Sequence, residues 1–314
     1  MQTDAPLLEA EVSVDYPGKP EALKNIRLRI EPGEVLGLVG ESGSGKSTLA
    51  LALLKLLSWK DGKVRGRIVF RGRDLLRSSE KELRRIRGRE IGLVMQSPQA
   101  SLNPALRIGT QLAEAWRAHN EGDAEAATAA VVRALMRVGL PNDSEFRRRF
   151  PSQISVGQAQ RVLIAIAVMH NPVLLIADEP TSALDVITQW ELLKMLAILN
   201  REMGSSVLFI SHDLQLVATI CQKIAILHNG EIVECGATEQ VVQRPQHPYT
   251  QQLLGCAPWI KLSAVSHTLR PDFHAVAKAE KWLYEQQTFP RQMPFGATVE
   301  PIRNDRLTET IVKG

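Results

Sequence analysis

A chain of 314 residues with 44% hydrophobic and 23% charged residues has the size and composition of a globular protein with a sizeable core. Its apolar runs fall short of the ~18 residues that span a bilayer, and its N-terminus lacks the layout of a signal peptide. The net charge of only +4, with acids interleaved in the basic run 71–90, argues against a nucleic-acid-binding protein. We expect a cytosolic protein.

The first third of the sequence alternates strand and turn signals around one strongly apolar helix, expected at residues 46–57. Pro32 and Gly33 split the segment before this helix into two strands. The charged segment 78–86 looks like a solvated helix face. Strands are expected at 8–16, 26–31, 34–40 and 90–96.

Residues 108–150 look helical, most clearly at 108–119 and 124–139. From Pro172 onward, apolar strands and helices alternate again, and one helix is expected to end at Gly204. Asn229 and Gly230 suit the type I′ turn of a hairpin. The elements of this part are expected at 172–180, 188–204, 205–213, 213–222 and 223–236.

Apolar strands that alternate with helices predict an α/β fold, in which a mostly parallel sheet is covered on both faces. A helical insertion subdomain is expected at about 97–170. After residue 255 the sequence has irregular prolines and one expected short helix, at 273–287. We therefore expect a domain at 1–255 and a C-terminal extension of unknown role at 256–314.

The cysteines Cys221, Cys235 and Cys256 are scattered and form no Cys-x-x-Cys pair. This spacing indicates neither a disulfide framework nor a zinc site. We expect buried thiols in a reducing compartment.

Residues 40–47, GESGSGKS, match the phosphate-binding P-loop pattern G-x-x-x-x-G-K-[ST] at every fixed position. In this loop, glycines let backbone N–H groups converge on phosphate oxygens, and the following helix N-terminus adds positive potential. We expect Lys46 to reach the β- and γ-phosphates, Ser47 to bind Mg²⁺ and Thr48 to touch phosphate. The full match argues against an ordinary glycine-rich turn. The candidate nucleotide-binding residues are Gly40, Glu41, Ser42, Gly43, Ser44, Gly45, Lys46, Ser47 and Thr48.

Two acids end the buried strand expected at 172–180, at the sheet edge where ligands of parallel sheets collect. Asp178 is suited to hold Mg²⁺, and Glu179 is suited to polarise the attacking water as general base. The alternative is that the two acids are only solvated turn residues. This interpretation is the weaker one, because the chain also has a P-loop.

The segment FISHD, residues 209–213, does not indicate a Ser-His-Asp triad, because neighbouring residues on a strand point to opposite faces. We expect His212 alone to act, by donating to the γ-phosphate and positioning the water. A histidine in a surface turn is the alternative.

The P-loop, VMQS, ISVGQAQR, LLIADEP, SALD and SHD occur in the order and approximate spacing of ATP-binding cassette (ABC) ATPase domains. Over roughly residues 8–255 the chain resembles this family. The resemblance implies a P-loop NTPase of the ABC type, with a mostly parallel sheet core, an antiparallel β subdomain and a helical insertion subdomain. It also implies ATP and Mg²⁺ as cofactors.

The resemblance implies roles for three further residues. Tyr16 resembles the aromatic residue that stacks on adenine, and an ordinary tyrosine is the alternative. Gln96 resembles the loop glutamine that contacts Mg²⁺ and couples to the membrane subunit of a transporter. Asp185, in SALD, resembles the dimer-contact loop.

ISVGQ resembles the family's signature sequence, Leu-Ser-Gly-Gly-Gln, which faces ATP held by the other subunit. The resemblance assigns ATP contacts to Ser155, Gly157 and Gln158. Ser155 and Gln158 also fit a capping box, and a capped helix N-terminus is a positive pole suited to a γ-phosphate. Val156 departs from the family pattern, because a β-branched residue adds bulk beside the nucleotide. We expect the site to work, since Ser155 and Gly157 remain.

Residues 96–112 and 244–254 resemble ATPase subunits of di- and oligopeptide importers, a subfamily that includes nickel importers. The implied protein is an ATPase that energises an importer for peptides or a related small solute through ATP-driven dimer closure. Its implied partners are integral membrane permease subunits, a second ATPase subunit in a homo- or heterodimer and, indirectly, an extracytoplasmic solute-binding protein. The implied location is cytoplasmic, on the inner face of the cell membrane, and no nucleic acid is expected.

The chain departs from that subfamily in one respect. Many of its proteins carry a C-terminal cysteine cluster thought to hold an iron–sulfur centre, but here only Cys256 lies beyond residue 250, so we expect no such cluster.

Other interpretations of the sequence stay open. An ABC-type ATPase attached to a soluble enzyme, as in the phosphonate carbon–phosphorus lyase system, is the first alternative. A non-transport ABC protein acting on DNA or ribosomes is the second, although such proteins usually carry a long insertion or two cassettes.

Overall fold

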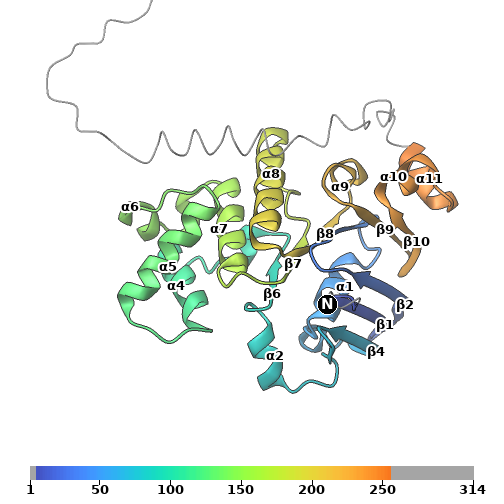
Figure 1. Ribbon diagram of the computed structural model, residues 1–314, viewed down its shortest axis with the longest axis horizontal. Helices are drawn as coiled ribbons and strands as arrows, with labels where there is room; N and C mark the ends of the chain where they lie inside the picture. Colours follow the sequence, from blue (N-terminus) through green and yellow to red (C-terminus); the bar gives the residue numbers. More distant parts are fainter. Residues whose placement is uncertain (1–4, 256–314) are drawn as a thin grey trace, which may run out of the picture. The chain divides into compact units, whose positions relative to one another are not determined.

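The structure is a computed structural model in which residues 5–255 are described, and its strands form two sheets (Figure 1). The first sheet is antiparallel, with the order β2-β1-β4-β5, and consists of β1 (Leu8–Tyr16), β2 (Lys19–Ile30), β4 (Lys63–Phe70) and β5 (Arg73–Asp74). The second has the order β10-β9-β3-β8-β7-β6 and consists of β3 (Val35–Val39), β6 (Ile91–Val94), β7 (Leu174–Asp178), β8 (Ser206–Ser211), β9 (Lys223–His228) and β10 (Glu231–Ala237). All its strand pairs are parallel except β9 with β10, which confirms the predicted α/β class.

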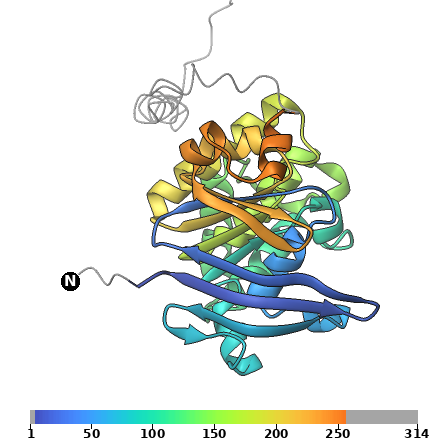
Figure 2. The same ribbon diagram turned by 90° about the vertical axis from the view of Figure 1, so that its right-hand side faces the viewer.

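Two hydrophobic cores lie on opposite faces of the six-stranded sheet. Because side chains alternate along a strand, Leu36 and Leu38 of β3 enter one core, whereas Val35 and Val39 enter the other. The first core is shared with the antiparallel sheet and contains helix α1 (Lys46–Leu53), which Figure 2 shows behind the strands of that sheet. The second core contains α7 (Val156–Val168), α8 (Val186–Met203) and α9 (Leu214–Ile220).

Between β6 and β7 the chain is helical and forms no strand, and these helices gather on the left of Figure 1. The longest of them buries Ala127, Val131 and Leu135, which recur at helical spacing on one face. The helices are α3 (Pro98–Ser101), α4 (Ile108–Arg117), α5 (Ala124–Arg137), α6 (Ser144–Arg148) and α7.

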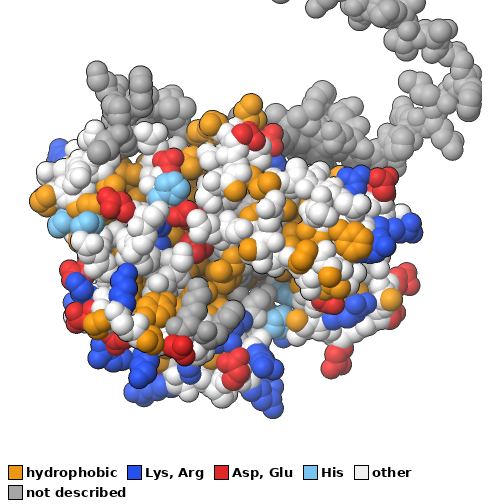
Figure 3. Space-filling view, turned by 180° about the vertical axis from the view of Figure 1, so that it is seen from behind, with side chains coloured by type: hydrophobic (Ala, Val, Ile, Leu, Met, Phe, Trp, Pro, Cys, Tyr) orange, Lys and Arg blue, Asp and Glu red, His pale blue; other side chains and the backbone are white. Residues whose placement is uncertain are grey.

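The charged segment near residue 80 forms α2 (Glu80–Ile86), which begins with a capping box on Ser79. Only Leu83 and Ile86 of this helix are buried, so the predicted solvated helix face is confirmed. In Figure 3, basic and acidic side chains gather together along the lower edge, where Figure 1 places α2 and β4. The last described helices are α10 (Thr238–Gln243) and α11 (Pro248–Gly255).

The predicted turn residues have the backbone angles that their positions require. Gly204 follows α8 in the left-handed region, with a φ of 62°. Asn229 and Gly230 both have positive φ, 48° and 80°, as the type I′ turn between β9 and β10 needs. The helix predicted at 46–57 is too long, because α1 ends at Leu53 and the Arg87 guanidinium takes the next two carbonyl groups as acceptors.

One of the two described thiols agrees with the prediction and the other does not. Cys221 is buried, and burial raises the pKa of its thiol. Cys235 is exposed, so the expectation of a buried thiol is wrong there, because β10 forms the edge of its sheet. Cys256 and the helix expected at 273–287 lie outside the described residues. None of the helices within residues 5–255 is both long and apolar enough to span a bilayer.

Candidate active site

The predicted P-loop connects β3 to α1, and its backbone depends on glycine at two positions. Gly45 precedes α1 with a φ of 111°, a left-handed conformation that side chains disfavour. A Cβ at Gly40 would lie 2.2 Å from the Leu227 carbonyl oxygen, so β9 leaves no room for a side chain. The buried hydroxyl of Ser44 has no hydrogen-bond partner among the described residues, which favours a polar ligand at this loop.

The ammonium group of Lys46 lies inside the curl of the loop. Its Nζ donates to the carbonyl oxygens of Gly40, at 2.7 Å, and Glu41, at 2.9 Å. The side chain is only 4% exposed and lies 3.6 Å from Oε1 of Glu179. A buried cation in a glycine-rich loop at a helix N-terminus is suited to phosphate oxygens.

Glu179 contacts three other predicted site residues. Oε2 of Glu179 accepts a hydrogen bond from Nε2 of Gln96 at 3.0 Å and lies 3.2 Å from Nδ1 of His212. With Lys46 on its other oxygen, the carboxylate contacts residues from three separate segments. Sequence positions 46, 96, 179 and 212 therefore meet at one point, at the carboxyl ends of the parallel strands.

The backbone of Glu179 is strained. Its φ of 45° lies in the left-handed region, which costs a non-glycine residue about 1–2 kcal/mol. The Glu179 N–H donates to the carbonyl of Ile210 at 2.9 Å, so the β7–β8 pairing holds this conformation. Strained residues of this kind concentrate at functional sites.

The residues predicted to hold Mg²⁺ offer the oxygen ligands that this ion prefers. Asp178 is buried at the end of β7, and Ser47 is exposed in the first turn of α1. Because the Gln96 amide nitrogen is used by Glu179, its amide oxygen is the acceptor that is left. No group of three histidine, cysteine or acidic residues suited to a metal occurs in the described part of the chain. The hydroxyl, carboxylate and amide oxygens of Ser47, Asp178 and Gln96 fit Mg²⁺, an ion that usually keeps several waters and binds substrate phosphates.

Tyr16 lies where the antiparallel sheet approaches the P-loop helix. It ends β1, is partly buried, and its hydroxyl lies 3.4 Å from Oγ1 of Thr48. The aromatic ring is thus next to the first turn of α1. This position is compatible with the predicted stacking on an adenine base.

The signature segment begins α7 with the predicted capping box. Oγ of Ser155 accepts from the Gln158 N–H at 3.2 Å, and Oε1 of Gln158 accepts from the Ser155 N–H at 3.0 Å. Val156 is the first residue of the helix. A Cβ at Gly157 would lie 3.0 Å from Cγ2 of Thr188, so glycine allows the close approach of α8.

The signature segment and the P-loop do not meet within one chain. Helix α7 packs in the core on one face of the six-stranded sheet, and α1 packs in the core on the other. Figure 1 shows α7 with the helical group and α1 with the antiparallel sheet. The two segments of one chain are therefore carried by helices on different faces of the sheet.

The turn that follows Glu179 lies beside the signature segment. Asp185 is the N-cap of α8, and its carboxylate accepts from the backbone N–H and the hydroxyl of Thr188. These bonds, led by the backbone bond from Thr188, lower the pKa of Asp185. Three large apolar side chains in the first turns of α8 are exposed, a feature that the sequence analysis missed: Val186, Ile187 and Trp190.

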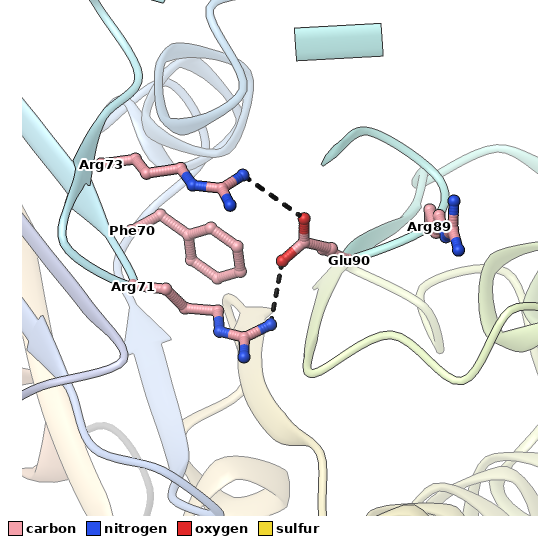
Figure 4. Close-up of a pocket in the computed structure, with 5 residues that line it drawn as sticks. All are labelled: Phe70, Arg71, Arg73, Arg89 and Glu90. Atoms are coloured by element: carbon pink, nitrogen blue, oxygen red, sulfur yellow. Dashed lines mark hydrogen bonds and ion pairs between the residues drawn. The ribbon is translucent and has the colours of Figure 1, made fainter. Parts of the chain in front are cut away.

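A cavity of about 400 Å³ lies away from the residues described so far (Figure 4). Its acid, Glu90, precedes β6, at the opposite end of the strand from Gln96. Arg71 and Arg73 lie 3.0 Å and 3.9 Å from the Glu90 carboxylate, and dashed lines mark these two ion pairs in Figure 4. Because none of the predicted site residues lines this cavity, we assign the nucleotide to the P-loop.

A P-loop at the end of a parallel strand, beside a buried acid from the neighbouring strand ends, defines the class of P-loop nucleotide-binding proteins. The chain belongs to the ABC transporter family, because the family model described as ABC transporter matches residues 23–182. The chain is 41% identical over 249 residues to the oligopeptide transport ATP-binding protein OppD of Bacillus subtilis, a match that covers 79% of this chain and 70% of that protein.

Two further comparisons extend this result. The glutathione import ATP-binding protein GsiA of Salmonella choleraesuis is 42% identical over 274 residues, which cover 85% of this chain. The chain spans only 44% of the length of that relative. The solved dimeric structure of the ATP-binding cassette MJ0796 in a post-hydrolysis state, bound to ADP and phosphate, has a TM-score of 0.64 at 29% identity. The matched region covers 74% of this chain and 98% of the MJ0796 chain.

Proposed function

We propose that this chain binds and hydrolyses ATP and so energises an ABC importer for di- or oligopeptides or a related small solute. The observation that carries this proposal is the meeting of Lys46, Gln96, Glu179 and His212 beside the P-loop. The printed names of the relatives, for glutathione import and oligopeptide transport, support the class of solute.

In this proposal each residue of the cluster has a role that follows from its position. The P-loop N–H groups and Lys46 hold the β- and γ-phosphates. The phosphate oxygens then replace the acceptors that the Lys46 ammonium group contacts at present. Glu179 accepts a proton from the attacking water, and His212 beside it fixes that water and donates to the γ-phosphate. Mg²⁺, held by Ser47, Asp178 and Gln96, would offset the charge of the phosphates.

A second ATPase subunit completes the site, because the signature of the same chain lies on the far face of the sheet. Ser155, Gly157 and Gln158 would contact the nucleotide held by that subunit. Asp185 and the apolar side chains after it would lie in the same contact between subunits. Exposed apolar surface of this kind is typical of an interaction site.

The proposal also includes membrane partners and a location. Gln96 begins the segment that leads into the helical subdomain at about 97–170 and would transmit closure of the dimer to integral membrane permease subunits. The chain would then work on the cytoplasmic face of the membrane, and an extracytoplasmic solute-binding protein would act through the permeases. We assign these tasks to the domain 1–255 and none to the extension 256–314.

Co-purification from the native host tests this function. We expect the tagged chain to bring down integral membrane subunits, and the assembly to hydrolyse ATP faster when its solute-binding protein is loaded. Recovery with a soluble enzyme and no membrane subunit would contradict the importer and favour an ATPase attached to a soluble complex.

Exchange of Val156 for glycine tests the unusual signature. We expect Val156→Gly to raise ATP turnover of the assembled complex about threefold, a change of about 0.7 kcal/mol in the barrier, because the bulk beside the nucleotide is removed. The Tm should fall by about 2–4 °C, since glycine weakens the start of α7. Val156→Ile, which keeps the β-branch, serves as the control. Unchanged turnover in Val156→Gly would mean that this position does not affect the site.

A further inference from the structure

Helix α11 carries a buried tyrosine that contacts the P-loop. The hydroxyl of Tyr249 accepts a hydrogen bond from the backbone N–H of Glu41, with 3.3 Å between nitrogen and oxygen. Tyr249 is only 6% exposed, and 208 positions separate it from Glu41. The proposed chemistry gives this contact no role.

The backbone of Glu41 is held on both sides of the loop. Its carbonyl oxygen accepts from Nζ of Lys46 at 2.9 Å and from the Ser44 N–H at 3.1 Å. These two bonds come from within the P-loop. The bond from the Glu41 N–H to Tyr249 holds the preceding peptide group of the same residue, and it comes from outside the loop.

The ring of Tyr249 is itself fixed by a second aromatic ring. It stacks on His228, with 3.7 Å between ring centroids and 28° between planes. His228 ends β9, and the preceding carbonyl, that of Leu227, is the group that leaves no room for a side chain at Gly40. The N–H of Gly230, in the turn after β9, donates to the carbonyl of Ser44 at 3.2 Å. A strand end, a hairpin turn and α11 thus support one side of the P-loop.

The chemistry of the hydroxyl suits this contact. Burial raises the pKa of Tyr249; the bond from the Glu41 N–H opposes this shift, and the nearby Glu41 carboxylate adds to it. The phenol therefore stays neutral at physiological pH and can accept from an N–H while it donates its own proton.

We propose that Tyr249 is a positioning residue that holds the P-loop in its phosphate-binding shape through the backbone of Glu41. A loop that is already ordered loses less conformational freedom when it binds phosphates. The expected benefit is tighter nucleotide binding with little change in the chemical step, because Tyr249 contacts neither Glu179 nor His212. Naming ATP and ADP as the ligands rests on the proposed function.

Tyr249→Phe tests this proposal, because it keeps the ring and its stacking on His228 and removes only the hydroxyl. In the protein without nucleotide, we expect the Glu41 amide to exchange its hydrogen about fivefold faster, whereas that of Leu49 in α1 is unchanged. By calorimetry, the Kd for ADP with Mg²⁺ should rise about fivefold, which is about 1 kcal/mol, while kcat at saturating ATP stays within about twofold. Gln252→Ala, an exposed position on the same helix, serves as the control and should change none of these values.

Three results would overturn the proposal: unchanged exchange at Glu41, faster exchange with an unchanged Kd, or a kcat that falls as far as the affinity. The exchange measurement needs no nucleotide. If the unaltered chain bound no ADP, the proposed function would fail, and the exchange rates would still decide whether Tyr249 orders the loop.

Discussion

Glu179→Gln should stop ATP turnover and leave ATP binding intact. The amide has almost the shape of the carboxylate and can still contact Gln96 and His212, but it cannot take a proton from water. We expect kcat to fall about 10²–10⁴-fold, the usual contribution of a general base. Phosphate release under saturating ATP measures this loss, and calorimetry with ATP should give a Kd within about threefold of the unaltered chain.

Because the bound ATP is not consumed, the Glu179→Gln chain should also accumulate as an ATP-dependent dimer in sedimentation velocity. Glu202→Gln, at an exposed position near the end of α8, is the matched control and should hydrolyse ATP normally. A Glu179→Gln chain that keeps more than a tenth of the normal turnover would require a different base.

The second large effect is expected for Lys46→Ala. This change removes the cation that contacts Gly40, Glu41 and Glu179, and it leaves the Glu179 carboxylate without its nearest positive charge. We expect turnover to fall about 10²-fold or more, as for the loss of one transition-state charge partner. The affinity for ATP should weaken about tenfold, since the lysine also contacts phosphate in the ground state.

The control for Lys46→Ala is Lys81→Ala, at an exposed position on α2, which should change neither the affinity nor the rate. Lys46→Ala should weaken ATP affinity as well as turnover, whereas Glu179→Gln should lower turnover alone, so the two variants together separate binding from chemistry. If Lys46→Ala lowered turnover without any loss of affinity, the ground-state contact would be wrong.

Local patterns made much of the fold predictable. The alternation of strands and helices from Pro172 to the hairpin, the glycine that ends α8 and the turn at Asn229 each depend on a few neighbouring residues, and the structure has them as expected. The capping box of Ser155 and Gln158 is of the same kind, because its three-residue spacing is local. The end of α1 was not predictable, because the chain turns left-handed at Lys55, which is not a glycine, and Arg87, 33 positions from Leu54, satisfies the Leu54 carbonyl group.

The residues of the candidate site were predictable from the sequence, but the contacts between their side chains were not. Motif patterns named Lys46, Gln96, Glu179 and His212, but the order of strands in the sheet decides that their side chains meet. The left-handed backbone of Glu179 had no signal in the sequence. Tyr249 was missed as well, because a hydrogen bond across 208 positions leaves no local pattern.

The placement of α1 and α7 on opposite faces of the sheet leads to the central claim, that one chain alone cannot assemble a complete hydrolytic site. The most direct test is the ATP turnover per chain, measured as the concentration of purified protein is lowered through the range where sedimentation shows monomers. The account predicts that turnover per chain vanishes on dilution and returns when the concentration of this chain or of its partner ATPase subunit is raised. Undiminished turnover by the isolated monomer would contradict it.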